Sequence, residues 1–383
     1  MVDASNAGLA PTGKTVDHAA VALLRTPVCD LLGIRVPILL AGMAAGPCTP
    51  ELVAAVSRAG GLGVFGATGM TAAAVAADIA RASELGATRI GVNVQITRPN
   101  TPRTDPGTLA VALADVRRAL GLPTTPGPPL PAPVPATARD LVAAALDAGA
   151  TVVITGLGDP AEIRDLADTY GVPVLAMVAT SAEAVRACGS GAHAIIAQGA
   201  EAGGHRASFE IPTDGRVPLV GTLALVPQVV DAVDVPVIAS GGIMDGRGLA
   251  AALALGAQAV SLGTRFLLAT ESAAPDIYRV SLPHLPETAT IVTDAVTGRP
   301  ARWVRNTIIE RLVDGPGHLG WGPQRRALED IRAAAIAQGI PEYLPMLAGQ
   351  GAGMAREQDA ADIVAEIATE AEGIIDRLAG RGR

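Results

Sequence analysis

The sequence predicts an α/β fold, a (β/α)8 TIM barrel, from three observations. Eight short apolar runs alternate with helix-like segments between residues 36 and 262. Most of these runs are apolar throughout, as strands buried on both faces of a parallel sheet are. Hydrophobic residues make up 49% of the chain and charged residues only 17%, so a large buried core can form. Eight such units fit a closed barrel better than an open sheet.

The elements follow one another with clear boundaries. The predicted strands are residues 36–41, 62–65, 90–94, 151–155, 172–177, 192–197, 236–239 and 259–262. After the first strand, Thr49-Pro50-Glu51 predicts a helix start, with a capping threonine, a proline in the first turn and an acid near the N-terminus. Gly60-Gly61 predicts its end. Thr71, Thr137 and Ser181 are expected to cap later helices.

Two segments depart from the alternation. Residues 97–136, after the third strand, form a Pro- and Thr-rich insertion with one helical piece at about 109–120; a lid and a mobile segment are both open interpretations. Residues 272–346, after the eighth strand, are predicted to be a lid-like subdomain on the substrate side. The barrel would then comprise residues 20–271 and 347–383. Its C-terminal tail, residues 358–378, is predicted to be one amphipathic helix.

Charge and cysteine content narrow the class of protein. The net charge is −8 and no basic cluster is present, which argues against nucleic-acid binding. Cys29, Cys48 and Cys188 are odd in number and scattered, so they predict neither a disulfide framework nor a metal site.

Hydropathy argues against a membrane protein. Residues 59–77 and 248–264 are long and uncharged, but polar residues interrupt both, and each divides into a helix and a strand. The first twenty residues lack an apolar segment typical of a signal peptide. We therefore expect a cytoplasmic protein.

The most informative motif follows the sixth strand and runs from Gln198 to Arg206. Loops at the carboxyl ends of parallel strands carry the chemistry of α/β proteins. Gly203-Gly204 allows the backbone to approach a flat or phosphorylated ligand, and His205 can titrate near neutral pH. This pattern predicts an enzyme with His205 as a candidate catalytic residue, although a lone loop histidine is more often structural than catalytic. His193 is interpreted as structural.

The next two strands end in glycine-rich loops, Ser240-Gly241-Gly242 and Gly263-Thr264. In barrels these loops commonly bind phosphate, through glycine amides, a hydroxyl group and a helix N-terminus. Two ordinary tight turns are the alternative. Asn93, at the end of the third strand, can bind the edge of a heteroaromatic ring or can be an ordinary turn residue.

These motifs together resemble the nitronate monooxygenase family, formerly called 2-nitropropane dioxygenases, which includes flavin-dependent enoyl-acyl-carrier-protein reductases. The resemblance covers about residues 30 to 375. It is carried by Ala41-Gly42-Met43, Gly91-Val92-Asn93, Gln198-Gly199-x-Glu201-Ala202-Gly203-Gly204-His205, Ser240-Gly241-Gly242-Ile243, Gly263-Thr264-Arg265-Phe266, Gly298-Arg299-Pro300-Ala301-Arg302 and Ala348-Gly349-Gln350-Gly351-Ala352-Gly353.

The resemblance implies FMN in a TIM barrel, a small-molecule substrate facing His205 and, by analogy alone, a homodimer. The implied cofactor-binding residues are Gly42, Met43, Asn93, Met177, Gln198, Gly203, Gly204, Ser240, Gly241, Gly242, Gly263 and Thr264. The chain departs from the family at residue 42, where proline is usual, at Ala207, where glycine is frequent, and in its long insertion. These departures leave the substrate open.

Two activities remain open at this point. The first is FMN-dependent oxidation of alkyl nitronates or nitroalkanes by O2 to a carbonyl compound and nitrite. The second is an NADH- or NADPH-dependent flavin reductase acting on a quinone, an enoyl thioester or a related acyl-CoA. An IMP dehydrogenase-like barrel would need a nucleophilic cysteine after the sixth strand, where the sequence has none. A flavin-binding protein without turnover is the non-enzymatic alternative.

Overall fold

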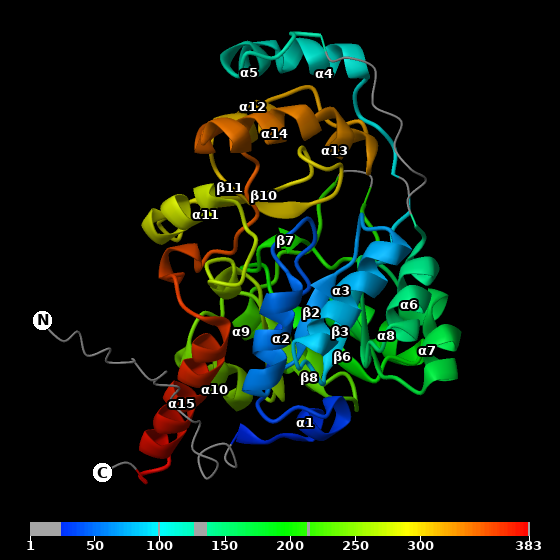
Figure 1. Cartoon of the computed structure of the whole chain (residues 1–383), viewed down its shortest axis with the longest axis vertical. Helices are drawn as coiled ribbons and strands as arrows, with labels where there is room; N and C mark the ends of the chain where they lie inside the picture. Colours follow the sequence, from blue (N-terminus) through cyan, green and yellow to red (C-terminus); the bar gives the residue numbers. More distant parts are fainter. Residues whose placement is uncertain (1–23, 99, 126–135, 213–214, 382–383) are drawn as a thin grey trace, which may run out of the picture.

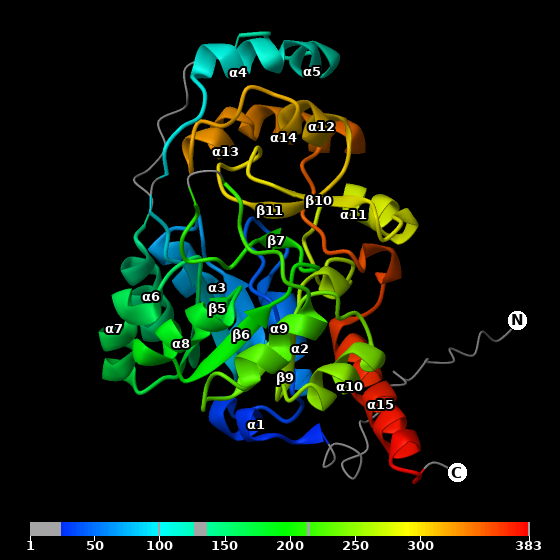
Figure 2. The same ribbon diagram turned by 180° about the vertical axis from the view of Figure 1, so that it is seen from behind.

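The structure is a computed structural model that describes residues 24–98, 100–125, 136–212 and 215–381. It has two stacked parts (Figures 1 and 2). A barrel of strands and surrounding helices forms one end, and a smaller layer of helices and short strands covers one opening of that barrel. We call this smaller layer the cap: residues 272–346 together with residues 100–125.

The barrel contains the eight predicted strands, each overlapping its predicted run. They are β1 (Ile38–Leu40), β2 (Gly63–Gly66), β3 (Ile90–Gln95), β4 (Val152–Gly156), β5 (Val174–Val178), β6 (Ala194–Gln198), β8 (Val237–Ser240) and β9 (Ala259–Leu262). All pair in parallel, in the order β1-β9-β8-β6-β5-β4-β3-β2. A parallel bridge between Leu39 and Leu62 joins the two end strands, so the predicted barrel closes.

Helices surround this sheet: α2 (Pro50–Ala59), α3 (Ala72–Glu84), α6 (Ala138–Asp147), α7 (Arg164–Tyr170), α8 (Ser181–Gly189), α9 (Thr222–Val230), α10 (Gly246–Ala254) and α15 (Ala360–Leu378). The short helix α1 (Pro27–Leu32) covers the end of the barrel opposite the cap (Figures 1 and 2). The Thr49 side chain accepts from the Leu52 amide, and Gly60 ends α2 at φ 104°, as predicted. Thr71 and Thr137 also cap as predicted.

One predicted cap is wrong by one residue. The residue before α8 is Thr180, whose extended backbone lets its hydroxyl accept from the Glu183 amide at 3.2 Å. Ser181 is already helical, so its side chain cannot reach back to a free amide of the first turn. Two adjacent hydroxyl residues are equivalent in the sequence, and only the backbone conformation distinguishes them.

The uncharged stretches divide between elements as expected. Residues 59–77 span the end of α2, all of β2 and the start of α3, and residues 248–264 run from α10 through β9. Within the described part of the chain, no helix is long and apolar enough to cross a membrane. The three cysteines are free thiols.

The cap contains α11 (Asp276–Ser281), β10 (Thr290–Thr293), β11 (Ala301–Val304), α12 (Thr307–Val313), α13 (Pro323–Ala327) and α14 (Glu329–Gln338). A short strand of the barrel loop after β6, β7 (Gly204–His205), pairs antiparallel with β11 and extends the sheet to β10-β11-β7. His205 therefore lies in the sheet of the cap, although it belongs to a loop of the barrel.

The insertion joins the same cap. Its single predicted helix is two short ones, α4 (Pro106–Ala112) and α5 (Ala114–Ala119), and α4 begins early because Asp105 caps it. Leu109 and Val116 are buried in an apolar cluster with residues of α12 and α14. The buried Arg117 pairs with Asp330 of α14 at 2.5 Å. Residues 100–125 are thus packed against residues 272–346.

The domain boundaries stay a prediction. Residues 109–120 of the insertion contribute to the apolar cluster of the cap rather than to the barrel core, and residues 347–381 return to the barrel through α15. The predicted barrel limits at 20–23 and 382–383, and residues 126–135 of the proline run, lie outside the described residues.

Candidate active site

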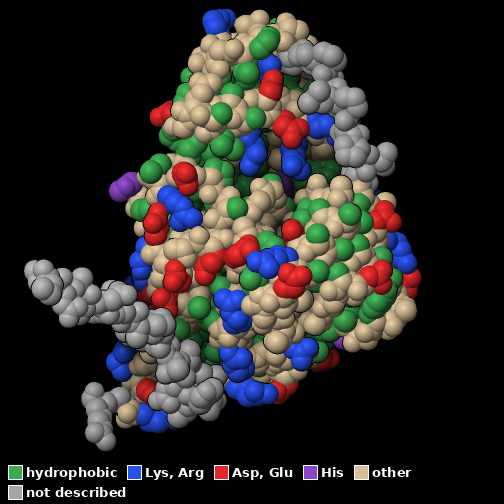
Figure 3. All heavy atoms as spheres, in the orientation of Figure 1, with side chains coloured by type: hydrophobic (Ala, Val, Ile, Leu, Met, Phe, Trp, Pro, Cys, Tyr) green, Lys and Arg blue, Asp and Glu red, His purple; other side chains and the backbone are tan. Residues whose placement is uncertain are grey.

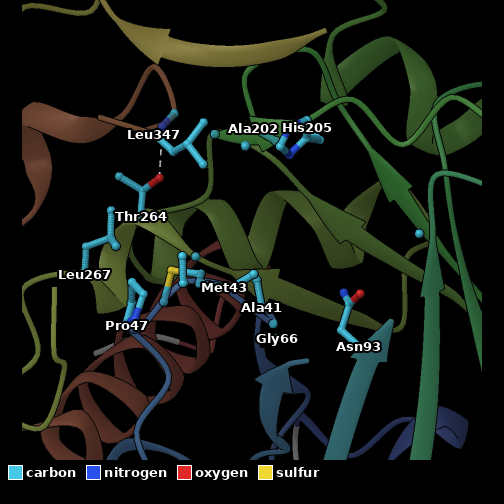
Figure 4. Close-up of a pocket in the computed structure, with 18 of the residues that line it drawn as sticks. Ala41, Met43, Pro47, Gly66, Asn93, Ala202, His205, Thr264, Leu267 and Leu347 are labelled. Atoms are coloured by element: carbon cyan, nitrogen blue, oxygen red, sulfur yellow. Dashed lines mark hydrogen bonds between the residues drawn. The ribbon is translucent and has the colours of Figure 1, made fainter. Parts of the chain in front are cut away.

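A cavity of about 330 Å³ lies at the carboxyl ends of the barrel strands, beneath the cap. Every predicted site residue lines it: Gly42, Met43, Asn93, Met177, Gln198, Gly203, Gly204, His205, Ser240, Gly241, Gly242, Gly263 and Thr264. Figure 4 shows His205 on the opposite side of the cavity from Met43 and Asn93. Residues from six of the eight barrel strands, or from the loops that follow these strands, therefore face one space.

The glycine loops after β8 and β9 carry free backbone donors. Gly241 and Gly242 have φ values of 113° and 71°, in the left-handed region that favours glycine. The N–H groups of Gly241, Gly242 and Gly263 make no hydrogen bond to any described residue. Amide donors converging at a loop and a helical N-terminus fit a phosphate group.

The segment after the cap closes this side of the cavity. Thr264 Oγ1 accepts from the Gly349 amide at 3.0 Å, the contact dashed in Figure 4, and can still donate its own proton. The Gln350 amide donates to the Glu201 carbonyl at 2.9 Å. A Cβ at Gly349 would lie 2.7 Å from that carbonyl oxygen, so this position requires glycine.

The acidic residue of the histidine motif builds the loop. Both carboxylate oxygens of Glu201 accept from the Thr222 amide at 2.9 Å, at the N-terminus of α9. A Cβ at Gly199 would lie 1.9 Å from Thr222 Oγ1, which leaves no room for a side chain. The spacing of Gly199 and Glu201 therefore reflects the packing of the loop on α9.

A buried arginine braces the same loop. Arg206 is 2% exposed, and its Nη1 donates to Gln198 Oε1 and to the carbonyls of Gln198 and Gly199 at 2.7–2.9 Å. Burial lowers the pKa of Arg206 to about 10, so it remains a cation at neutral pH. Gln198 Nε2 donates to the His205 carbonyl at 2.9 Å. The sequence reasoning missed Arg206, because a loop arginine is usually exposed.

The first loop and β3 pack tightly. A Cβ at Gly42 would lie 2.5 Å from Asn93 Cβ, so glycine here gives Asn93 its place, and proline would displace it. Asn93 Nδ2 contacts Met177 Sδ at 3.3 Å. Below this loop, burial raises the pKa of the Cys48 thiol to about 12, which makes it an unreactive, structural group.

Gln95 is a cavity residue that the sequence reasoning missed. It lies two positions after Asn93 on β3, and residues two apart share one face of a strand. Its Oε1 is buried and has no hydrogen-bond partner among the described residues. An unpaired buried acceptor costs about 1–3 kcal/mol, so Gln95 is suited to bind a ligand in the cavity. The sequence did contain a signal for this residue, since Gln95 lies two positions after the predicted site residue Asn93 on the same strand.

His205 is held by a hydroxyl and two indole rings. Its Nε2 lies 2.9 Å from Thr297 Oγ1, and this hydroxyl donates to the Arg299 carbonyl at 3.2 Å. Since the carbonyl can only accept, Nε2 carries the proton and Nδ1 is the basic nitrogen. The rings of Trp321 and Trp303 meet the imidazole edge-on, with centroids at 5.0 and 6.3 Å.

The charge state of His205 differs from the sequence expectation. Burial, and then the positive charges of Arg299 and Arg325, lower the pKa of His205 to about 3. The expectation that this histidine titrates near neutral pH is therefore wrong, because the cap partly buries the imidazole and supplies two cations. His205 is a neutral imidazole across the physiological range.

His193 has a structural role, as expected. It directly precedes β6, and its Nδ1 accepts from the Val174 amide at 3.0 Å. Across the described ranges, no group of three or more His, Cys, Asp or Glu side chains could hold a metal ion.

A closed parallel barrel, a cavity at its carboxyl ends and a histidine opposite phosphate-type loops define an enzyme of the (β/α)8 class. Comparison with known families is more specific. The model of the nitronate monooxygenase family matches residues 25–370, and the chain belongs to this family. It is thus an oxidoreductase.

Individual relatives agree with this assignment. The chain is 33% identical over 360 residues to a probable nitronate monooxygenase of Staphylococcus saprophyticus, covering 92% of this chain and 99% of the relative. A probable nitronate monooxygenase of Staphylococcus aureus strain Newman is 35% identical over 341 residues, covering 88% and 95%.

Two solved structures resemble the whole chain. Nitroalkane oxidase from Streptomyces ansochromogenes is 34% identical with a TM-score of 0.81, covering 92% of this chain and 99% of that one. FabK from Thermotoga maritima is 32% identical with a TM-score of 0.72, covering 93% and 99%. The barrel and the cap are therefore a shared architecture.

Proposed function

We propose that this protein binds FMN and oxidises alkyl nitronates, or their parent nitroalkanes, with O2. In the balanced reaction, two nitronates and one O2 give two carbonyl compounds and two nitrites. In each nitronate, the carbon that bears nitrogen gains one oxygen atom, and the carbon–nitrogen bond breaks to release nitrite. Membership of the family and likeness to a nitroalkane oxidase support this proposal. The observation that carries it is the neutral His205, facing a cavity whose far side has free phosphate-type donors.

The cavity residues fit FMN. The amides of Gly241, Gly242 and Gly263, with the Thr264 hydroxyl, would hold the phosphate. The ring would contact Gly42, Met43, Asn93, Met177, Gln198, Gly203, Gly204 and Ser240 or their neighbours. When bound, FMN supplies the electron-accepting chemistry that no side chain in the cavity provides.

His205 determines which form of the substrate reacts. With a pKa of about 3, its Nδ1 is a weak base and takes a carbon-bound proton poorly. A nitronate arrives with that proton already removed. Its negative charge is also favoured by the positive charges of Arg325, which lines the cavity, and of the buried Arg299. Both charges disfavour protonation of His205. We therefore expect the nitronate to be a better substrate than the neutral nitroalkane.

The cap shapes the space for the carbon chain. Trp303, Trp321 and Leu344 line the cavity together with Met43 and Leu267 of the barrel side. Apolar walls of this kind exclude water and accept small alkyl groups.

The alternative activity, an NADH- or NADPH-dependent flavin reductase, is favoured by one observation besides the likeness to FabK. Arg325 and Arg332 of the cap line the cavity and form no ion pair with any described residue. Figure 3 shows basic side chains at the edge of the hollow between cap and barrel. Such cations could bind the phosphates of a dinucleotide or an acyl-CoA.

A spectrophotometric screen of the FMN-loaded protein against nitronates, NADH and NADPH tests this proposal. We expect oxygen consumption with nitrite formation from ethyl nitronate, and little oxidation of NADH or NADPH. The reverse pattern would support the reductase, on a quinone or an enoyl thioester. A cytoplasmic location, a homodimer and the lack of nucleic-acid binding are further proposals, testable by fractionation, light scattering and gel shift.

A further inference from the structure

Asn100 lies at the start of the described part of the insertion, in residues 100–104, which we call its first limb. Its side chain joins two loops of the cap, residues 294–299 and residues 318–321. Its Nδ2 donates to the Gly298 carbonyl at 2.5 Å, and its Oδ1 accepts from the Trp321 amide at 2.6 Å. A carboxamide has a donor at one end and an acceptor at the other, so one side chain satisfies both loops. Both contacts are made across about two hundred residues of sequence.

The two loops carry the groups that surround His205. Thr297 directly precedes Gly298 and binds His205 Nε2, while Trp321 packs edge-on against the imidazole. The loops also touch each other: Gly298 has φ 84°, and a Cβ there would lie 2.4 Å from the Gly320 carbonyl carbon. A displacement of either loop would therefore reach His205.

A second set of contacts fastens the same limb. Arg103 Nη2 lies 2.7 and 2.6 Å from the carboxylate oxygens of Asp294, at the start of the Thr297 loop. The amides of Arg103 and Thr104 donate to the His318 carbonyl, ahead of Trp321, at 2.7 and 3.2 Å. The Arg103–Asp294 pair is partly exposed and adds little energy alone. Arg103 therefore also contacts both loops, at Asp294 and His318, whereas Asn100 contacts the residue next to Thr297 and Trp321 itself.

We propose that Asn100 is a positioning residue, which holds Thr297 and Trp321 against His205. In this proposal the first limb of the insertion is a fixed part of the cap, which keeps the two loops in place, and does not move as a lid. The catalytic part of this inference rests on the function proposed above for His205. The structural part, which is the placement of Trp321 by Asn100, is independent of that function.

The test is the isosteric variant Asn100→Asp in the FMN-loaded enzyme. The carboxylate still accepts from Trp321 but faces the Gly298 carbonyl with a second acceptor, so that contact breaks. The chain contains only two tryptophans, Trp303 and Trp321, so 5-fluorotryptophan labelling gives two ¹⁹F resonances. Trp303→Phe identifies them. We expect the Trp321 resonance to shift or broaden, and the kcat/KM for ethyl nitronate to fall at least about tenfold, with FMN affinity within about twofold.

Thr101→Ala is the matched control, because Thr101 is the next residue, is exposed, and has no side-chain hydrogen bond to a described residue. It should change neither readout. An unshifted Trp321 resonance in Asn100→Asp, or a shifted one with unchanged kcat/KM, overturns the proposal. If the wild type turns over no nitronate, the proposed function fails. The Trp321 resonance then still shows whether Asn100 holds the two loops in place. Asn100→Ala decides by the same readouts if the aspartate variant does not fold; loss of folding in both indicates a purely structural role and also overturns the proposal.

Discussion

His205 Nε2 lies 2.9 Å from Thr297 Oγ1, a residue ninety-two positions further along the chain. The pairing of His205 with Ala301 across β7 and β11 brings these two groups together. The hydroxyl fixes the tautomer of the imidazole, and the surrounding cap keeps the ring uncharged. A loop of the barrel therefore supplies the histidine that we propose as catalytic, and the cap sets its tautomer and lowers its pKa.

Thr297→Val should lower activity without changing the volume of the side chain. The Nε2–H of His205 would lose its partner, at a cost of about 1–3 kcal/mol, and the ring could adopt the other tautomer. We expect kcat/KM for ethyl nitronate to fall about tenfold to a hundredfold. Thr288→Val, at an exposed threonine of the cap, is the control. Equal activity of both variants would contradict the role of Thr297.

The plot of kcat/KM against pH should not show the change near pH 6.5 that an ordinary histidine would cause. Because the pKa of His205 is about 3, its neutral form is fully populated above about pH 5. The kcat/KM for a preformed nitronate should show no ionisation between about pH 5.5 and 8. Steady-state kinetics of the wild type and His205→Asn across this range check the prediction. A wild-type limb near pH 6.5 that disappears in the variant would show that His205 titrates normally.

The same pKa predicts a change in stability with pH. In the unfolded chain this histidine binds a proton below about pH 6.5, whereas in the folded protein it stays neutral down to about pH 3. The contribution of His205 to the free energy of unfolding is thus complete above about pH 6.5 and declines as the pH falls toward 3. Urea unfolding at about pH 7 and pH 5 should show a larger loss for the wild type than for His205→Asn. Equal losses would refute the shift.

Gly203→Ala should damage the site through the backbone. A Cβ at Gly203 would lie 2.6 Å from the Ala348 carbonyl carbon and the Gly349 nitrogen. Overpacking of this kind costs about 1–3 kcal/mol, and here it pushes apart two loops of the cavity. We expect a lower melting temperature and weaker FMN binding. Gly189→Ala, where the added Cβ meets nothing within 4 Å, should lower neither.

Substrate preference tests the weak basicity of His205. Ethyl nitronate should be turned over with a kcat/KM at least about tenfold above that of nitroethane, because the enzyme need not remove the carbon-bound proton. Oxygen-electrode assays with freshly prepared nitronate measure this ratio. A higher kcat/KM for nitroethane would mean that His205 is a stronger base than its surroundings imply.

The barrel could be predicted because its signals are local. Runs such as residues 172–177 are apolar on both faces, and Thr49 and Gly60 mark the two ends of α2 within a few residues. The glycine loops and the histidine motif likewise lie within single βα units, so their places at the carboxyl ends of the strands followed from the barrel itself.

The surroundings of His205 could not be predicted, because they depend on contacts between distant segments. Thr297, Trp321 and Asn100 meet only after the cap folds over the barrel. Arg206 is ordinary in the sequence and becomes a buried brace only through the carbonyls that converge on it. The pKa of His205 was misjudged for the same reason, since desolvation and the charge of Arg299 come from the assembled cavity.

Anaerobic mixing of the FMN-loaded protein with ethyl nitronate, and separately with NADH and NADPH, tests the central claim most directly. The measured quantity is the rate at which the visible flavin absorption is lost. The proposed function predicts rapid loss with ethyl nitronate and none with either nicotinamide at the same concentration. Rapid loss with NADH or NADPH, and none with ethyl nitronate, would contradict it and identify the protein as a reductase.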